Sequence, residues 1–157
     1  MDMRSEAIDE IKDAIIYDIR RSAATDIWSC IDLTYYTCYH LMKSLVFCNN
    51  KKIDLTKTSH IAVSEAYNAL YSKTRKNRIG NTVGGKRTLE TWKELRSEST
   101  YNCSNARFIV DDAEAKYRLE KMGVFINDHF AFLNERFKID ITSLQTSVKK
   151  LKGWNFK

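Results

Sequence analysis

The chain has 157 residues and a mass of 18.3 kDa, which suits one domain with a sizeable core rather than two ordinary domains. Hydrophobic residues make up 43% and charged residues 29%, a balance that excludes global disorder. Proline is absent, where average usage would supply roughly eight, and there are five glycines. Because so little interrupts long helices, we expect a mainly helical fold.

The sequence gives no sign of a membrane or export segment. The N-terminus is charged from Asp2 onward, and the longest charge-free run, residues 33–42, has ten residues. The four cysteines, Cys30, Cys38, Cys48 and Cys103, show no CxxC spacing. We interpret them as reduced thiols and expect a cytoplasmic protein with no membrane partner.

Two helices are predicted in the first third of the chain. Isoleucines at 8, 11, 15 and 19 step by three or four residues, which predicts a helix over about residues 5–21. Thr25 or Asp26 can cap the next helix. Its main apolar stripe consists of Ile27, Ile31, Tyr35, Cys38, Met42 and Leu45, and a second stripe on nearly the opposite side consists of Leu33, Tyr36, His40 and Phe47. This helix is therefore either central in the bundle or also faces a second subunit.

Further helices are predicted over about residues 58–73, as a short element around Trp92, and over about residues 111–137. Between the first two, residues 73–87 contain six basic residues, no acidic residue and three glycines, which predicts a mobile loop. Residues 141–157 form a basic tail that we expect to fray, so the predicted domain spans residues 1–140. The predicted fold is an all-α, up-and-down bundle of four to five helices.

Enzyme signatures are absent from the sequence: there is no phosphate loop, GxSxG or HExxH. The three histidines, His40, His60 and His129, do not stand at metal-ligand spacing from one another. We therefore expect no metal and no cofactor. His129 is interpreted as structural or exposed, and His40 as a satisfied histidine at an interface.

Three stretches carry a family resemblance. Residues 34–46 read TYYTCYHLMKSLV and resemble the AYYAxFHAAKALL pattern of the HEPN superfamily. Ser59 and His60, followed by Tyr67, resemble that family's THxxxxxxF element. Residues 96–102, RSESTYN, are similar to its RxxADYD segment before the last long helix. The order and spacing agree over about residues 5–137.

The resemblance implies a compact helical bundle, usually a homodimer, found in prokaryotic toxin–antitoxin pairs, antiviral defence systems and ribonucleases. Many members are paired with a nucleotidyltransferase antitoxin. In ribonuclease members, an Arg followed after four to six residues by His forms the active motif. The corresponding positions here are Tyr101, Asn102 and Cys103, so the chain resembles the branch of the family with an RxxADYD-like motif instead.

The missing histidine matters because cleavage through the ribose 2′-OH needs a group that exchanges a proton near neutral pH and a cation beside the phosphorane. Arg96 can supply the cation, whereas Tyr101, with a reference pKa near 10, is a poor base. Alternatively, Arg96 and Tyr101 stabilise the turn before the last helix through hydrogen bonds. His60 either caps or packs at the start of its helix, or reaches toward Arg96.

Six basic residues are candidates for binding nucleic acid: Lys73, Arg75, Lys76, Arg78, Lys86 and Arg87. They are either a solvated surface or a patch that attracts a polyanion, which the net charge of +6 and the pI near 9.1 favour. Tyr71 and Trp92 flank the loop and either stack a base or belong to the core.

Two functions follow as hypotheses. In the first, the chain is an RNA-binding or RNA-cleaving component of a toxin–antitoxin or antiviral system, with Arg96, Tyr101 and His60 as candidate catalytic residues; any cleavage would be metal-independent. In the second, it is a non-catalytic module that dimerises or holds a nucleotidyltransferase through the second stripe, Leu33, Tyr36, His40 and Phe47. As a third possibility from the resemblance, Tyr101 accepts a nucleotidyl group from that partner.

Overall fold

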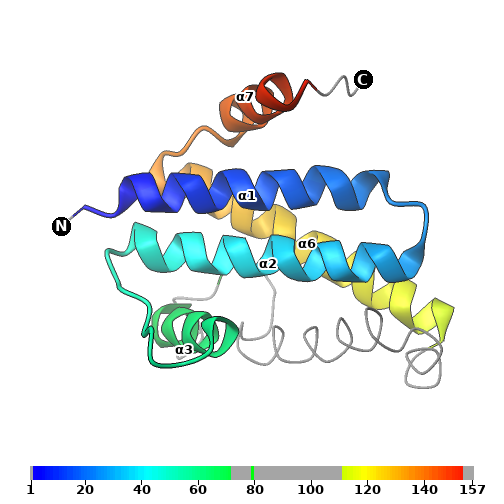
Figure 1. Ribbon diagram of the computed structural model, residues 1–157, viewed down its shortest axis with the longest axis horizontal. Helices are drawn as coiled ribbons and strands as arrows, with labels where there is room; N and C mark the ends of the chain where they lie inside the picture. Colours follow the sequence, from blue (N-terminus) through cyan, green and yellow to red (C-terminus); the bar gives the residue numbers. More distant parts are fainter. Residues whose placement is uncertain (1, 72–78, 80–110, 154–157) are drawn as a thin grey trace.

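A computed structural model of the chain describes residues 2–71, 79 and 111–153, and these residues form five α-helices and no strand. The helices are α1 (Arg4–Ala23), α2 (Ile27–Cys48), α3 (Ser59–Tyr71), α6 (Asp112–Phe137) and α7 (Ile141–Lys152). The predicted all-α, up-and-down bundle is confirmed for this part of the chain (Figure 1). None of the helices so described combines the length and the apolar character that crossing a bilayer would require.

Helix α1 packs along α2 through one apolar face. Ile11 and Ile15 are completely or almost completely buried, together with Ala7 and Ala14. The other two predicted seam residues, Ile8 and Ile19, are half-buried, because they lie toward the two ends of the helix. The isoleucine spacing therefore predicted both the helix and its buried face, and α1 extends slightly beyond the predicted residues 5–21.

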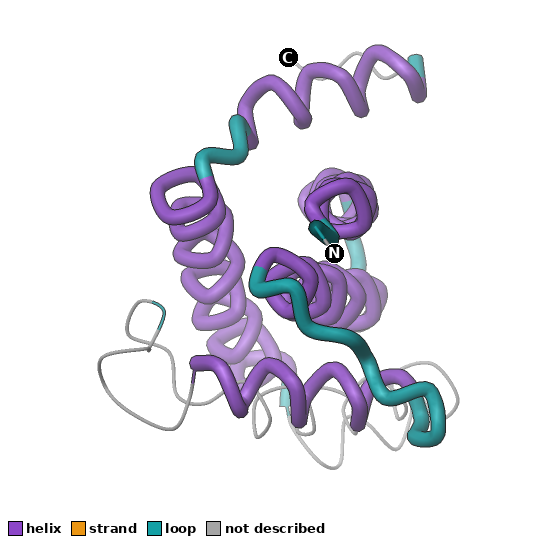
Figure 2. Tube along the Cα trace, turned by 90° about the vertical axis from the view of Figure 1, so that its left-hand side faces the viewer, coloured by secondary structure: helices purple, strands orange, loops and turns teal. Residues whose placement is uncertain are grey.

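Helix α2 is the central helix of the bundle. It begins at the predicted cap, because the Asp26 carboxylate accepts a hydrogen bond from the Ser29 backbone N–H at 3.0 Å. It contacts α1, α3 and α6, which surround it in Figure 2. The main stripe is buried from Ile31 to Leu45, and only Ile27 at the start is partly exposed. Of the two alternatives for this helix, the central position is thus confirmed.

Helices α3 and α6 complete the core around α2, and α6 crosses it and leads into α7 (Figure 1). Helix α6 covers Asp112–Phe137, in agreement with the predicted residues 111–137, and buries Met122, Ile126 and Leu133. Its C-cap is Lys138, which adopts the left-handed conformation at φ 56° and so terminates the helix. Helix α3 begins one residue after the predicted start at 58, and the last two residues of its predicted span lie outside the described part of the chain.

The expectation that the tail frays is wrong for residues 141–152, which form helix α7. The Asp140 carboxylate accepts hydrogen bonds from the Ser143 backbone N–H at 3.0 Å and from its hydroxyl at 2.8 Å. At the other end, Gly153 adopts the left-handed conformation at φ 66°. Ile141 and Val148 are buried, and α7 lies against α1 (Figure 1). Capping at both ends and two buried side chains stabilise a helix whose apolar pattern is sparse.

The N-terminal residues connect the ends of two other helices. The Arg4 guanidinium donates hydrogen bonds to the backbone oxygens of Phe137 at 2.9 Å and of Lys138 at 3.3 Å, where α6 ends. The Met3 backbone N–H donates to Asn50 Oδ1 at 2.9 Å, just after α2. The start of α1 is therefore fixed to the ends of both α2 and α6.

Candidate functional site

Most of the candidate catalytic and nucleic-acid-binding residues lie outside the described residues. These are Arg96 and Tyr101, and the basic residues Lys73, Arg75, Lys76, Arg78, Lys86 and Arg87. The predicted loop over residues 73–87 and the predicted short helix around Trp92 also lie there. His60 is the candidate catalytic residue whose place the structure describes. It is the second residue of α3 and is half-buried.

Tyr67, the third member of the Ser59–His60–Tyr67 element, is a core residue. Its side chain is 3% exposed, and its hydroxyl lies 2.6 Å from His129 Nε2 on α6. Burial raises the pKa of the Tyr67 phenol well above its usual range. The hydroxyl therefore stays protonated and serves to hold α3 against α6.

His129 is fully buried between Tyr67 and Phe125, which confirms its structural interpretation over an exposed position. Its Nδ1 lies 2.7 Å from the Phe125 backbone oxygen. Because that oxygen can only accept, Nδ1 carries the proton, and in the neutral ring Nε2 accepts from Tyr67. Burial lowers the pKa of His129 to about 4. A neutral imidazole that is hydrogen-bonded through both ring nitrogens helps to hold α3 against α6. Neither nitrogen is available to bind a ligand.

The second stripe of α2 is half-buried. Its residues, Leu33, Tyr36, His40 and Phe47, all have intermediate exposure, and α1 covers part of it. The Tyr17 ring of α1 stacks on Tyr36 with a centroid distance of 5.1 Å and on His40 at 5.5 Å. Part of the surface that we assigned to a second subunit is therefore occupied within the chain.

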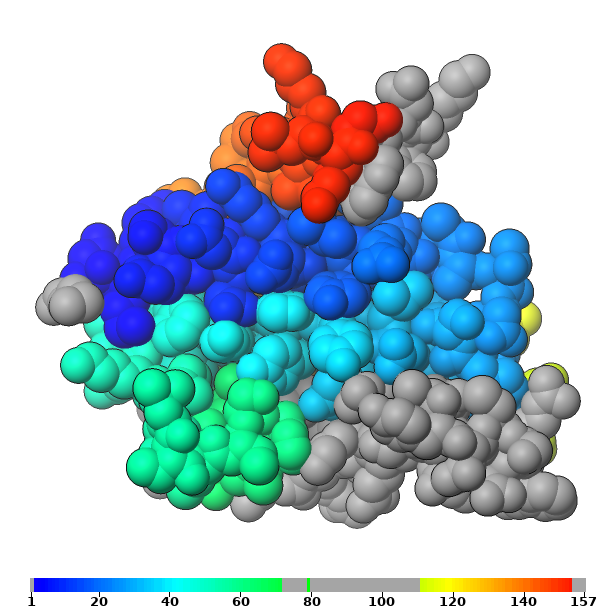
Figure 3. All heavy atoms as spheres, in the orientation of Figure 1, coloured from blue at the N-terminus to red at the C-terminus, as the bar shows by residue number. Residues whose placement is uncertain are grey.

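A polar and aromatic cluster surrounds His40, and we call it the His40 cluster. It consists of Glu10 and Tyr17 from α1 and of Tyr36, Tyr39, His40 and Lys43 from α2. The Glu10 carboxylate accepts from His40 Nδ1 through Oε2 at 2.6 Å and from Lys43 Nζ through Oε1 at 2.9 Å. Figure 3 shows the face on which α1 and α2 lie side by side at the surface of the bundle.

The electrostatics of the His40 cluster favour the ion pair. Burial acts to raise the pKa of Glu10, but the hydrogen bonds from His40 and Lys43 and their charges outweigh it, so that the pKa is lowered. Burial likewise acts to lower the pKa of Lys43, and its contact with Glu10 outweighs this and raises the pKa. The site therefore presents a carboxylate, an imidazole and an ammonium group between two helices.

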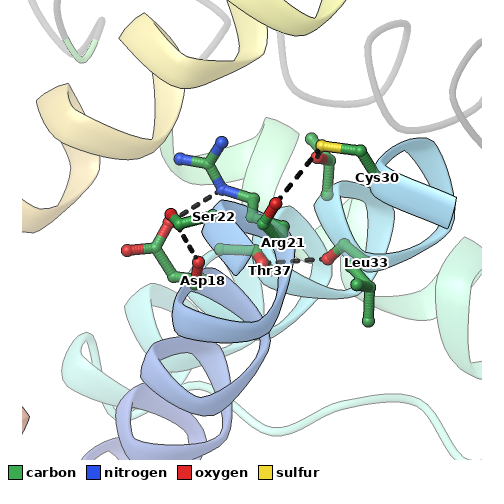
Figure 4. A network of polar contacts seen from close by, with 7 residues as sticks. Asp18, Arg21, Ser22, Cys30, Leu33 and Thr37 are labelled. Carbon is green, nitrogen blue, oxygen red and sulfur yellow. Dashed lines mark hydrogen bonds and ion pairs between the residues drawn. The ribbon is translucent and has the colours of Figure 1, made fainter. Parts of the chain in front are cut away.

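Two of the described cysteines, Cys38 and Cys48, are poor nucleophiles. Cys30, Cys38 and Cys48 are free thiols. Burial raises the pKa of Cys38 far above its usual range and that of Cys48 to about 11. Cys30 Sγ donates to the Arg21 backbone oxygen at 3.6 Å where α1 turns into α2, within the network of Figure 4. These thiols therefore have packing roles.

Sequence patterns missed the pairing of Glu10 with His40, because the two residues are thirty positions apart and carry no motif. The signal that could have found it is the second stripe itself. A histidine and three aromatic or apolar residues on one face of α2 require a partner helix, and α1 has a carboxylate at 10 and a tyrosine at 17 on one face.

Comparisons of the chain with family models, with curated proteins and with solved structures found no match.

Proposed function

We propose that the chain is an RNA-binding, HEPN-like component of a toxin–antitoxin or antiviral system that acts as a cytoplasmic homodimer. Arg96 binds a phosphate of the RNA, while Tyr101 and His60 orient the ligand or supply weak acid and base help. The six basic residues between 73 and 87 gather the RNA. The proposal rests on the three stretches that resemble the HEPN patterns and on the helical bundle that contains two of them.

The distribution of charge is the observation that carries RNA binding. Residues 72–110 contain nine basic residues and only three acidic ones, Glu90, Glu94 and Glu98, so this segment supplies an excess equal to the net charge of +6. The rest of the chain has equal numbers of basic and acidic residues. A local excess of this kind attracts a polyanion and makes its affinity strongly dependent on salt.

The test is a titration of fluorescently labelled single-stranded RNA with the purified chain at several salt concentrations in EDTA. Reversing three charges, R75E/K76E/R78E, is expected to weaken binding at least about tenfold and to reduce the salt dependence. The matched control, K51E/K52E/K116E, changes the net charge equally at exposed lysines of the described bundle. Equal losses in the two variants would mean that overall charge, not this segment, attracts RNA.

Cleavage is tested in the same samples. Arg96→Ala should abolish any RNA cleavage that persists in EDTA and should leave the helical content unchanged. If no cleavage occurs at any concentration of the unaltered chain while RNA still binds, the nuclease part of the proposal fails and the binding part stands.

A non-catalytic module is the second candidate, and the residues at 101–103 favour it. Tyr101, Asn102 and Cys103 correspond to the positions of the ribonuclease histidine, and none is a residue type whose reference pKa lies as near neutral pH as that of histidine. Such a module would bind a second copy or a nucleotidyltransferase through the exposed parts of Leu33 and Phe47. The R75E/K76E/R78E variant would then keep its partner in co-purification and its dimer in sedimentation. Intact mass after co-expression would reveal a nucleotidyl group on Tyr101.

A further inference from the structure

We infer that Glu10, Asp13 and His40 form a binding site for a divalent first-row transition metal ion, with Zn²⁺ as the representative ion. Glu10 and Asp13 lie one turn apart on α1, and His40 lies on α2. One ligand atom from each of the three side chains lies within 4.8 Å of the others. The site adds a property to the bundle that the sequence did not predict, since we expected no metal.

The spacing of the three ligand atoms suits such an ion. Zinc binds imidazole nitrogen and carboxylate oxygen at about 2.0–2.2 Å, so that neighbouring ligand atoms stand roughly 3–4 Å apart. His40 Nδ1 and Glu10 Oε2 are hydrogen-bonded at 2.6 Å, so the two atoms must separate by about 1 Å to bind the same ion. The ion would then take the place of the hydrogen between them.

The side chains around the site hold two of the ligands in place. The His40 ring is stacked on Tyr17 at an interplanar angle of 9° and meets the edge of Tyr39 at 79°. Lys43 binds Glu10 Oε1, which orients the carboxylate and leaves Oε2 directed at His40. Contacts of this kind to metal ligands preserve their geometry and are a regular part of metal sites. They also reduce the conformational entropy lost on binding.

The donor set determines the class of ion and the openness of the site. One imidazole and two carboxylates suit Zn²⁺, Fe²⁺ or Mn²⁺, whereas Mg²⁺ and Ca²⁺ prefer oxygen alone. Asp13 is exposed, while Glu10 and His40 are half-buried, so the remaining coordination positions face solvent and can hold water. The positive charge of Lys43 opposes the ion and limits its affinity. None of its residues is among those proposed to bind RNA.

The experiment is a calorimetric titration of the chelator-treated full chain with Zn²⁺, followed by Co²⁺ absorption to report the ligand field. We expect one ion per chain, with affinity reduced at least about tenfold in His40→Ala and Glu10→Gln and by a smaller factor in Asp13→Asn. The matched controls are Asp9→Asn and Glu6→Gln, two other exposed carboxylates on α1. Both should bind as the unaltered chain does.

Three results would overturn the inference: no binding to the unaltered chain, binding that survives His40→Ala unchanged, or complete displacement of the ion by a modest excess of Mg²⁺. Circular dichroism verifies that each variant is folded. If His40→Ala does not fold, Asp13→Asn decides, because Asp13 is at the surface and its substitution leaves the α1–α2 contact intact. An unaltered affinity and Co²⁺ spectrum in Asp13→Asn would then reject the three-ligand site.

Discussion

The hydroxyl of Tyr67 donates a hydrogen bond to Nε2 of His129 over 2.6 Å, and it joins α3 to α6 inside the core. The imidazole is held from its other side, where Nδ1 binds the Phe125 backbone oxygen and the ring stacks on Phe125 at 3.8 Å between centroids. Both polar groups are buried and satisfied. This hydrogen bond between side chains 62 residues apart therefore helps to fix the register of α3 on α6.

Tyr67→Phe should destabilise the fold by about 1–3 kcal/mol, because it leaves His129 Nε2 buried without a donor while it preserves the aromatic packing. Chemical denaturation followed by circular dichroism measures the loss. Tyr117→Phe is the matched control, since Tyr117 is 52% exposed and its substitution should cost little. A loss in Tyr67→Phe no larger than in this control would contradict the structural role of the bond.

The stability of the fold should fall as the pH drops from about 6.5 toward 4. In the unfolded chain His129 titrates near 6.5, whereas burial lowers its folded pKa to about 4. Between these values the unfolded state binds more protons, so the contribution is fully present above pH 6.5 and is lost as the pH falls. For one fully buried group this amounts to about 3 kcal/mol.

Glu10, Asp54 and Asp140 also have lowered pKa values, so their protonation in acid also destabilises the fold. The contribution of His129 must therefore be measured separately from theirs. Unfolding free energies of the unaltered chain and of His129→Gln, measured from pH 5 to 7, make this separation. The variant should be less stable overall and should show a flatter slope between pH 5 and 6.5. Parallel slopes would mean that His129 is not the group that titrates.

The ion pair between Glu10 and Lys43 should contribute a coupling energy of about 1 kcal/mol to the α1–α2 contact. Their side chains are 14% and 26% exposed, so solvent screens the pair only in part. A double-mutant cycle with Glu10→Gln and Lys43→Met measures this coupling energy. We expect the coupling energy to decrease at about 1 M salt, because salt screens the two charges. A coupling near zero at low salt would show that this ion pair does not help to hold the two helices together.

Asp140→Ala should loosen α7 without unfolding the bundle, because it removes the hydrogen bonds to the Ser143 backbone and hydroxyl. Hydrogen exchange of the α7 amides should become faster, while exchange in α1 and α2 stays unchanged. Asp54→Ala is the control. Asp54 lies in the connection between α2 and α3, and its carboxylate accepts hydrogen bonds from Thr56, which is not part of a helix. Unchanged exchange in α7 would mean that its contacts with α1, not its cap, hold it.

Helices with dense apolar stripes could be predicted from the sequence alone. The steps of three and four residues in α1, α2 and α6 gave their extents to within a few residues, because a buried face repeats with the period of the helix. Helix α7 was underestimated for the same reason. It buries only Ile141 and Val148, and its stability depends on Asp140 and Gly153 at its ends, signals that stripe counting ignores.

The candidate site could be predicted only in part. The spacing on α2 singled out His40, but the partner on α1 depends on how far one helix slides along the other, and a periodicity does not contain that register. His129 shows the converse case. The sequence left His129 as either structural or exposed, and the bond to Tyr67 depends on the packing of α3 on α6. Arg96, Tyr101 and the basic residues between 73 and 87 remain predictions of the sequence.

The hydrogen bonds that Met3 and Arg4 make to the ends of α2 and α6 have a consequence for any shortened version of the chain. The guanidinium of Arg4 neutralises the partial negative charge where α6 stops, and the Met3 amide secures the segment that leaves α2. Cutting away the first four residues would thus expose carbonyl groups some 130 positions downstream. An affinity tag joined close to this end would disturb the point where α6 stops, so a spacer before Asp2 is the safer choice for expression.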